Sequence, residues 1–155
     1  GVGASVIVGQ NLGARQPERA ERSGWLAAGM AQVFMLVCAL AALLGAEYII
    51  RIFNSDPALV KLGASFLRIA AAGYAIMGFG TVLSHCISGS GDTIPTLVVS
   101  IVTMWVILLP LAWALPKVTN LDVYGVRWAI VINIAVGAAA YVTYFRLGRW
   151  KKKRI

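Results

Sequence analysis

The sequence predicts an all-α integral membrane protein with four full transmembrane helices and the end of a fifth. Hydrophobic residues make up 59% of the 155 residues and charged residues only 13%. Soluble domains carry about 25% charged residues, so this composition indicates a chain that folds in lipid. The hydrophobic residues also gather into runs of about 20, the length that crosses a bilayer as a helix.

The chain opens with a short apolar segment, residues 1–12. As a helix this segment would extend about 18 Å, against about 30 Å of hydrocarbon in a bilayer. We therefore expect the second half of a membrane helix, in a chain that is a fragment. The charge-rich segment Gly13–Ser23 then predicts a loop. Residues 24–46 contain no charge and predict the first full span.

A second span is expected within residues 62–88, as part of a helix that begins earlier. Glu47–Ser55 is interpreted as a short amphipathic connection at the membrane surface. Asp56 and Pro57 then suit the N-cap and the first position of a helix. A helix reaching from there to residue 88 would be about 48 Å long, so it must tilt, protrude or bend. The expected bending points are Gly73, Gly78 and Gly80.

A polar turn, Ser88–Pro95, leads into the third span, residues 94–115. Because the connection is short, the two helices must lie side by side and antiparallel. We expect Gly89 to end the first helix in the left-handed conformation. Asp92 or Thr93 would cap the next helix, with the closing proline in its first turn. A phosphate cradle is disfavoured, because the turn has no lysine and its carboxylate would repel an anion.

The third span contains Pro110, which removes one backbone hydrogen bond, frees the carbonyl of Val106 and predicts a kink. Pro116 is expected to close this span. A polar connection, Lys117–Val123, then leads to the last span, residues 124–145. Aromatic residues near the ends of the spans suit an interfacial belt. They are Trp25, Tyr48, Trp128, Tyr144 and Trp150.

The chain ends in a basic tail, residues 146–155, which holds six of its fourteen Lys and Arg residues. A cationic cluster directly after an apolar span is typical of a juxtamembrane anchor, and it does not indicate a nucleic-acid partner. The alternating spans place nine cationic residues on the side of the tail and five on the opposite side. The positive-inside rule therefore predicts a cytoplasmic C-terminus.

Catalytic and metal chemistry find little support in the sequence. Cys38 and Cys86 lie in apolar runs and are interpreted as packing residues. The single histidine, His85, supplies neither a metal site nor a paired acid and base. Its roles left open are hydrogen-bonded packing and proton sensing at the cytoplasmic mouth. We expect no enzyme, no metal site and no cofactor.

Several side chains inside the spans are candidates for lining a transport pathway. Gln32 and Asn133 lie deep enough to face protein or a water-filled cavity, with helix–helix hydrogen bonding as the alternative role. Methionine and aromatic side chains would offer an adaptable apolar surface, with plain packing as the alternative. The pathway candidates are Gln32, Tyr74, Met77, Met104, Trp105 and Asn133.

Two motifs, in this order and with one helix pair between them, resemble those of the multidrug and toxic compound extrusion (MATE) family of transporters. The first is Val8-Gly-Gln-Asn-Leu-Gly-Ala-Arg15, at the end of a membrane helix. The second is Ile87-Ser-Gly-Ser-Gly-Asp-Thr-Ile-Pro95. Their structural residues are Gly9, Gln10, Gly13, Gly89, Gly91, Asp92, Thr93 and Pro95.

The resemblance implies part of a six-helix lobe, the C-terminal lobe of a twelve-helix transporter. It implies export of organic, often cationic, compounds by alternating access, driven by Na⁺ or H⁺, in the plasma membrane (inner membrane) of a bacterium or archaeon. The partners would be small organic substrates, a coupling cation, the lipid bilayer and the missing N-terminal lobe. Some branches carry an acidic residue in the tenth helix. Here Leu67–Ser88 has none and Met77 stands near its place, so any essential acid would lie in the missing helices.

Two other functions stay open from the sequence. A flippase for lipid-linked oligosaccharides belongs to the same wider superfamily, but the spans contain almost no buried cation for a pyrophosphate carrier. A non-transporting scaffold subunit of a membrane complex fits the composition equally well. Only the paired motifs argue against it.

Overall fold

The computed structural model describes residues 1–119 and 121–152, and these form helices with no strand. Within this part of the chain, four stretches are long and apolar enough to cross a membrane: Pro17–Phe53, Pro57–Gly89, Thr93–Val118 and Val123–Leu147. The elements are α1 (Val2–Gly13), α2 (Pro17–Phe53), α3 (Pro57–Gly89), α4 (Thr93–Ile101), η1 (Val102–Leu108), α5 (Leu109–Val118), α6 (Val123–Leu147) and η2 (Arg149–Lys152).

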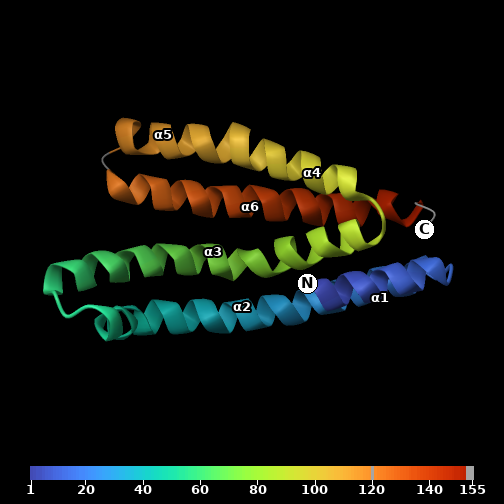
Figure 1. Ribbon diagram of the computed structural model, residues 1–155, viewed down its shortest axis with the longest axis horizontal. Helices are drawn as coiled ribbons and strands as arrows, with labels where there is room; N and C mark the ends of the chain where they lie inside the picture. The colour runs from blue at the N-terminus through green and yellow to red at the C-terminus, as the bar shows by residue number, and fades with distance from the viewer. Residues whose placement is uncertain (120, 153–155) are drawn as a thin grey trace.

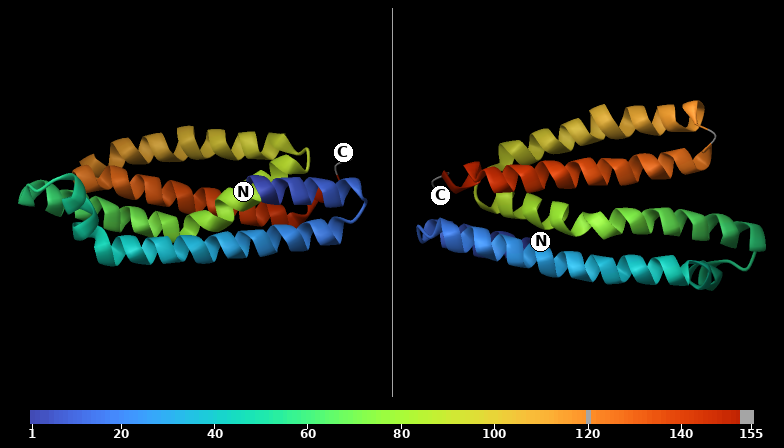
Figure 2. Two further views of the ribbon diagram at one scale, coloured as in Figure 1. Left: turned by 60° about the horizontal axis from the view of Figure 1, so that its bottom comes forward. Right: turned by 180° about the vertical axis from the view of Figure 1, so that it is seen from behind.

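The long helices lie side by side along one axis (Figure 1). Helix α3 contacts α2 on one side and α6 on the other, and α6 also contacts the α4–η1–α5 stretch. Helix α1 packs against both α2 and α3 (Figure 2). The α1–α2 corner, the α3–α4 corner and the C-terminal end gather at one end of the bundle (Figure 1). We call this the tail end, and the other the opposite end.

Helix α2 is longer at both ends than the sequence predicted. It begins at Pro17, which needs no N–H at the first helical position, so most of the loop predicted over Gly13–Ser23 is helical. It continues to Phe53, so the connection predicted over Glu47–Ser55 is helical too, apart from its last two residues. The predicted ends of this helix were wrong because hydropathy identifies only the apolar part of a helix, the part that lies in lipid. The flanking Ala, Glu and Arg residues still favour helix in water.

Helix α3 begins as predicted, with the Asp56 carboxylate accepting a hydrogen bond from the backbone N–H of Ala58 at 2.9 Å. Its ribbon changes direction near the middle in every view (Figures 1 and 2). The glycines expected to allow bending also allow close packing. A Cβ at Gly78 would lie 2.6 Å from Cα of Gln32 in α2. A Cβ at Gly80 would lie 3.0 Å from Cα of Ala138 in α6.

The α3–α4 corner differs from its prediction in three ways. The helices that it joins are antiparallel but do not lie side by side along their length, because α6 packs between them (Figure 1). Gly91, with φ 79°, is the glycine with positive φ there, whereas Gly89 is the last residue of the helix. Asp92 occupies the N-cap position of α4, but its carboxylate makes no cap hydrogen bond. It instead accepts a hydrogen bond from the Tyr144 hydroxyl at 2.5 Å, because α6 ends beside this corner.

The stretch from α4 to α5 contains a π-helical segment. The N–H of Leu109 donates to the carbonyl of Met104, five residues earlier. This irregularity directly precedes Pro110, the residue for which a kink was predicted, and which has no N–H to donate. Pro116 does not end the helix, because α5 continues to Val118.

The turn that follows α6 packs against the bundle. Helix α6 is ended by Gly148 in the left-handed conformation, with φ 67°, and η2 follows. Trp150 is fully buried and stacks on Phe145, with ring centroids 4.5 Å apart. Its indole N–H donates to the carbonyl of Phe145 at 2.9 Å. The placement of Trp150 in an interfacial belt was therefore wrong. Residues 153–155 of the predicted tail lie outside the described part of the chain.

Candidate functional site

A pocket of about 230 Å³ lies between α3, η1 and α6. It brings together two of the six pathway candidates, Met77 from α3 and Asn133 from α6. The other lining residues are Gly80, Thr81, Ser84, Thr103, Ile134, Gly137, Ala138 and Tyr141.

Helical spacing explains how these residues share one pocket. Met77, Thr81 and Ser84 are separated by four and three positions, which places them on one face of α3. Asn133, Gly137 and Tyr141 recur every four positions along α6. This spacing of polar and small residues was present in the sequence. It did not predict the pocket, because the sequence does not show that these faces of α3 and α6 are turned toward each other.

The most unusual atom of the pocket is the amide oxygen of Asn133. It is buried, and no residue of the described chain donates a hydrogen bond to it. Leaving a buried acceptor unsatisfied costs about 1–3 kcal/mol. Buried polar groups of native proteins nearly always have a partner, so such an atom calls for an explanation. Asn133 lines the pocket, which makes its oxygen the candidate acceptor for a hydrogen-bond donor that enters there.

The hydroxyl groups of the lining add further acceptors. Ser84 donates its hydroxyl proton to the carbonyl of Thr81 at 2.9 Å. Thr103 donates to the carbonyl of Val99 at 2.7 Å. Since a hydroxyl has one proton and two lone pairs, both oxygens retain acceptor capacity. No lining residue is charged. The pocket therefore combines acceptor oxygens with apolar surface, the mixture found in sites for small organic molecules.

Gln32 has a different environment, at the crossing of α2 and α3. Its amide N–H donates to the carbonyl of Ala75 at 2.5 Å, and its amide oxygen accepts from the N–H of Phe79 at 3.2 Å. Ala75 and Phe79 are four residues apart, so the glutamine amide bonds to a carbonyl and an N–H that are hydrogen-bond partners in a regular α-helix. A side chain inserted there is a known cause of a helix bend. This geometry is helix–helix hydrogen bonding, the alternative role considered for Gln32.

The remaining pathway candidates lie outside the pocket. Tyr74, Met104 and Trp105 have exposed fractions of 39%, 55% and 63%. Each belongs to a helix that lines the pocket, α3 or η1, but it is not among the lining residues. The sequence did not indicate whether these three side chains would face the pocket or the surface, because α3 and η1 are apolar on several faces.

The glycines of the two motifs meet in the structure. A Cβ at Gly9 in α1 would lie 2.9 Å from the carbonyl oxygen of Gly89 in α3, and a Cβ at Gly89 would lie 2.6 Å from the carbonyl oxygen of Ser5. By contrast, a Cβ at Gly13 would meet no atom within 4 Å. Gln10 is exposed. Thr93 opens α4, and Pro95 is its third residue. The first motif therefore contributes Gly9 to a close helix crossing.

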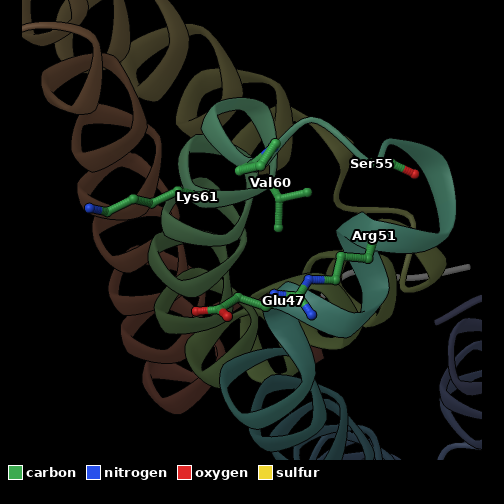
Figure 3. Close-up of a pocket in the computed structure, with 6 residues that line it drawn as sticks. Glu47, Arg51, Ser55, Val60 and Lys61 are labelled. Carbon is green, nitrogen blue, oxygen red and sulfur yellow. The ribbon is translucent and has the colours of Figure 1, made fainter.

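A second pocket, of about 530 Å³, lies where α2 meets α3 at the opposite end, and it contains charged residues. Glu47 and Arg51 lie close together there, whereas Lys61 and Ser55 point away from them (Figure 3). Because the two cationic side chains do not converge, this pocket makes a weaker candidate than the one around Asn133.

The sequence of the chain is similar to a family of known proteins. The family model described as MatE matches residues 1–114 of the chain. "Probable multidrug resistance protein NorM" of Rhodopseudomonas palustris is 31% identical over 148 residues, covering 93% of the chain and 31% of the relative. "Multidrug resistance protein NorM" of Burkholderia vietnamiensis is 30% identical over 152 residues, covering 95% and 33%.

A more distant relative, "Probable multidrug resistance protein NorM" of Thermotoga maritima, is 22% identical over 134 residues, covering 86% of the chain and 28% of the relative. In all three comparisons the chain is aligned over most of its own length. It spans about a third of the length of these relatives.

Proposed function

The chain belongs to the MatE family, and from this premise we propose that it forms part of a multidrug transporter that exports organic, often cationic, compounds. The relatives named as multidrug resistance proteins support this activity. The observation that carries the proposal is the uncharged pocket around Asn133, in which a buried acceptor oxygen stands among apolar and small side chains.

The pocket suits a compound that is mostly apolar and carries at least one N–H or O–H donor. Met77 and Ile134 provide adaptable apolar contact, since an unbranched thioether side chain adopts many shapes. The amide oxygen of Asn133 then accepts the hydrogen bond of the donor. Binding by few polar and many apolar contacts gives a broad substrate range, because only one group of the ligand must be placed accurately.

We further propose that transport proceeds by alternating access and is coupled to Na⁺ or H⁺. Secondary transporters place substrate between two structural repeats, which rock about the bound ligand. The curated relatives are about three times as long as this chain, which leaves room for the second lobe. No carboxylate lines the pocket, so the residues that bind the coupling ion would belong to the remainder of the transporter.

In this proposal the tail end of the bundle faces the cytoplasm of a bacterial or archaeal cell. Nine Lys and Arg residues belong to this end of the chain and five to the opposite end. Cytoplasmic loops carry the excess of cationic residues in membrane proteins.

Dye accumulation tests the proposed activity. The full-length transporter would be produced in a bacterial strain that lacks its own efflux pumps, and uptake of ethidium would be followed by fluorescence. Energised cells should accumulate less dye than cells with an empty vector. Selective collapse of the Na⁺ gradient or of the proton gradient would identify the coupling ion. Equal dye levels with and without the transporter, across several cationic and neutral dyes, would refute the proposal.

A further inference from the structure

Both ends of the bundle carry cationic residues, and some at each end have an intramolecular partner, among them Arg146 over the ring of Trp25 and Lys151 beside Glu21 at the tail end. At the opposite end, Arg68 forms an ion pair with Glu47 at 3.1 Å. Lys117 lies over the ring of Trp113, with Nζ 4.0 Å from the centroid, and Arg127 lies over the ring of Phe66. Three of the five cations of this end therefore have an intramolecular partner.

At the tail end, three arginines have no such partner. Arg15, Arg22 and Arg149 are exposed, and none of them forms an ion pair within the described residues. We call these three residues the arginine rim. Two carboxylates of this end are already engaged, since Glu21 binds Lys151 at 2.5 Å and Asp92 accepts the Tyr144 hydroxyl. The third carboxylate of this end, Glu18, is exposed and lies four positions before Arg22. With nine cationic and three acidic residues, the tail end keeps a larger positive charge than the opposite end, which has five and three.

The fold holds the rim together although its members are far apart in the sequence. The Glu21–Lys151 ion pair joins the start of α2 to η2. Glu21 directly precedes Arg22, and Lys151 lies two residues after Arg149. Burial of Trp150 fixes η2 against the bundle, so Arg149 is presented by an ordered turn.

The rim also stands where the apolar part of the helices ends. Pro17–Phe53 and Val123–Leu147 are membrane-length helices. Arg22 lies in the second turn of the first, directly before its uncharged stretch, and Arg149 lies just beyond the end of the second. In a bilayer this position is the headgroup region. An arginine guanidinium binds phosphate through two parallel hydrogen bonds, which makes exposed interfacial arginines suited to lipid phosphates.

From these observations we propose that the arginine rim binds the headgroups of anionic phospholipids at the membrane surface. A cationic cluster beside a membrane helix attracts anionic lipid, and each Lys or Arg strengthens the attraction about fivefold. The attraction falls with rising ionic strength, because salt screens exposed charges.

Retention of lipid by the purified full-length transporter tests this proposal. Native mass spectrometry would count the phosphatidylglycerol and phosphatidylcholine molecules retained from an equal mixture. The wild type should retain phosphatidylglycerol in clear excess. The double variant Arg22→Gln/Arg149→Gln should weaken this preference by about 30-fold, from about fivefold per arginine.

A matched control is available at the opposite end. Arg51 and Lys61 are also exposed, so Arg51→Gln/Lys61→Gln removes the same charge from the chain. It should leave the preference within about twofold, because Arg51 lies close to Glu47 and Lys61 points away from both, so the two cations do not form one site (Figure 3). An equal loss in this control would overturn the proposal, and so would equal retention of the two lipids by the wild type. Displacement of phosphatidylglycerol by millimolar inorganic phosphate would identify a soluble anion as the ligand. Because the measurement needs no transport, its outcome is independent of the proposed function.

Discussion

Gly9 of α1 and Gly89 of α3 lie against each other, so closely that a Cβ on Gly9 would stand 2.9 Å from the carbonyl oxygen of Gly89. Each glycine belongs to one of the two motifs that resemble the MATE family, and 80 positions of sequence separate them. The two motifs therefore meet at one helix crossing. Glycine at both positions lets two backbones approach without side chains between them.

The first prediction concerns this crossing. Gly89→Val should destabilise the fold by about 1–3 kcal/mol, because the added atoms must displace the backbone of α1 near Ser5. Thermal unfolding of the detergent-purified protein, followed by size-exclusion chromatography with fluorescence detection, measures the loss. Gly13→Val is the matched control, since a Cβ there meets no atom within 4 Å. Equal melting temperatures for the two variants would contradict this account of the crossing.

The second prediction concerns the α3–α4 corner. Gly91 has φ 79°, a left-handed conformation that costs a residue with a Cβ about 1–2 kcal/mol. We expect Gly91→Val to impair export by distorting the corner, while Gly91→Asn is tolerated better because asparagine accepts this conformation. Dye efflux, normalised to the amount of inserted protein, compares the two variants. Normal efflux by a well-inserted Gly91→Val variant would refute the prediction.

The third prediction concerns the orphan acceptor of the pocket. Asn133→Leu keeps the branched outline and the number of side-chain heavy atoms but lacks the oxygen. It should lower efflux of dyes with N–H donors about tenfold, for one lost hydrogen bond of about 1.4 kcal/mol. Efflux of a dye without donors should be unchanged, or improved because the lining becomes more apolar. Protein stability should not fall, since this oxygen has no intramolecular partner among the described residues. An equal loss for both kinds of dye would exclude a hydrogen-bonding role.

The fourth prediction separates the two interactions that hold η2. Trp150 is fully buried, so Trp150→Ala should cost about 3–5 kcal/mol through lost packing. The Glu21–Lys151 pair is partly exposed, with side-chain exposures of 31% and 27%. Lys151→Ala should therefore cost at most about 1 kcal/mol.

Limited proteolysis of the tail, together with thermal unfolding, distinguishes these two variants. Trp150→Ala should release η2 from the bundle, so that trypsin cleaves the chain after Arg149 and Lys151. Lys151→Ala should leave η2 protected. The opposite ranking would mean that the ion pair, and not the tryptophan, holds the turn in place.

Much of the fold followed from local sequence. Hydropathy identified four membrane-length helices, and the Asp56–Pro57 pair correctly placed the start of α3. The errors occurred where two tendencies compete. Helix α2 continues past its apolar run because Ala, Glu and Arg favour helix in water as well. At the α3–α4 corner, either of two glycines could have taken the left-handed conformation, and packing of Gly89 against α1 left that role to Gly91.

The candidate site was only partly predictable, because its residues come from different helices. Asn133 and Met77 were identified as polar or adaptable residues inside the spans. Gln32 had the same sequence signal as Asn133, yet its amide bonds to the backbone of α3, whereas Asn133 lines a pocket and its amide oxygen has no partner among the described residues. The sequence cannot show which of the two side chains bonds to a neighbouring backbone and which lines a pocket, since both residues lie deep in apolar helices.

The sequence by itself determined the class of the protein, its helices and the resemblance carried by its two motifs, because hydropathy, caps and turn residues act over short distances along the chain. Only the tertiary structure decided which residues meet: Gly9 with Gly89, Gln32 with the α3 backbone, Tyr144 with Asp92, and Trp150 with the core. Helices that are apolar on several faces could pack in several rotations. The choice among them depends on how small residues and single polar groups fit together across the bundle.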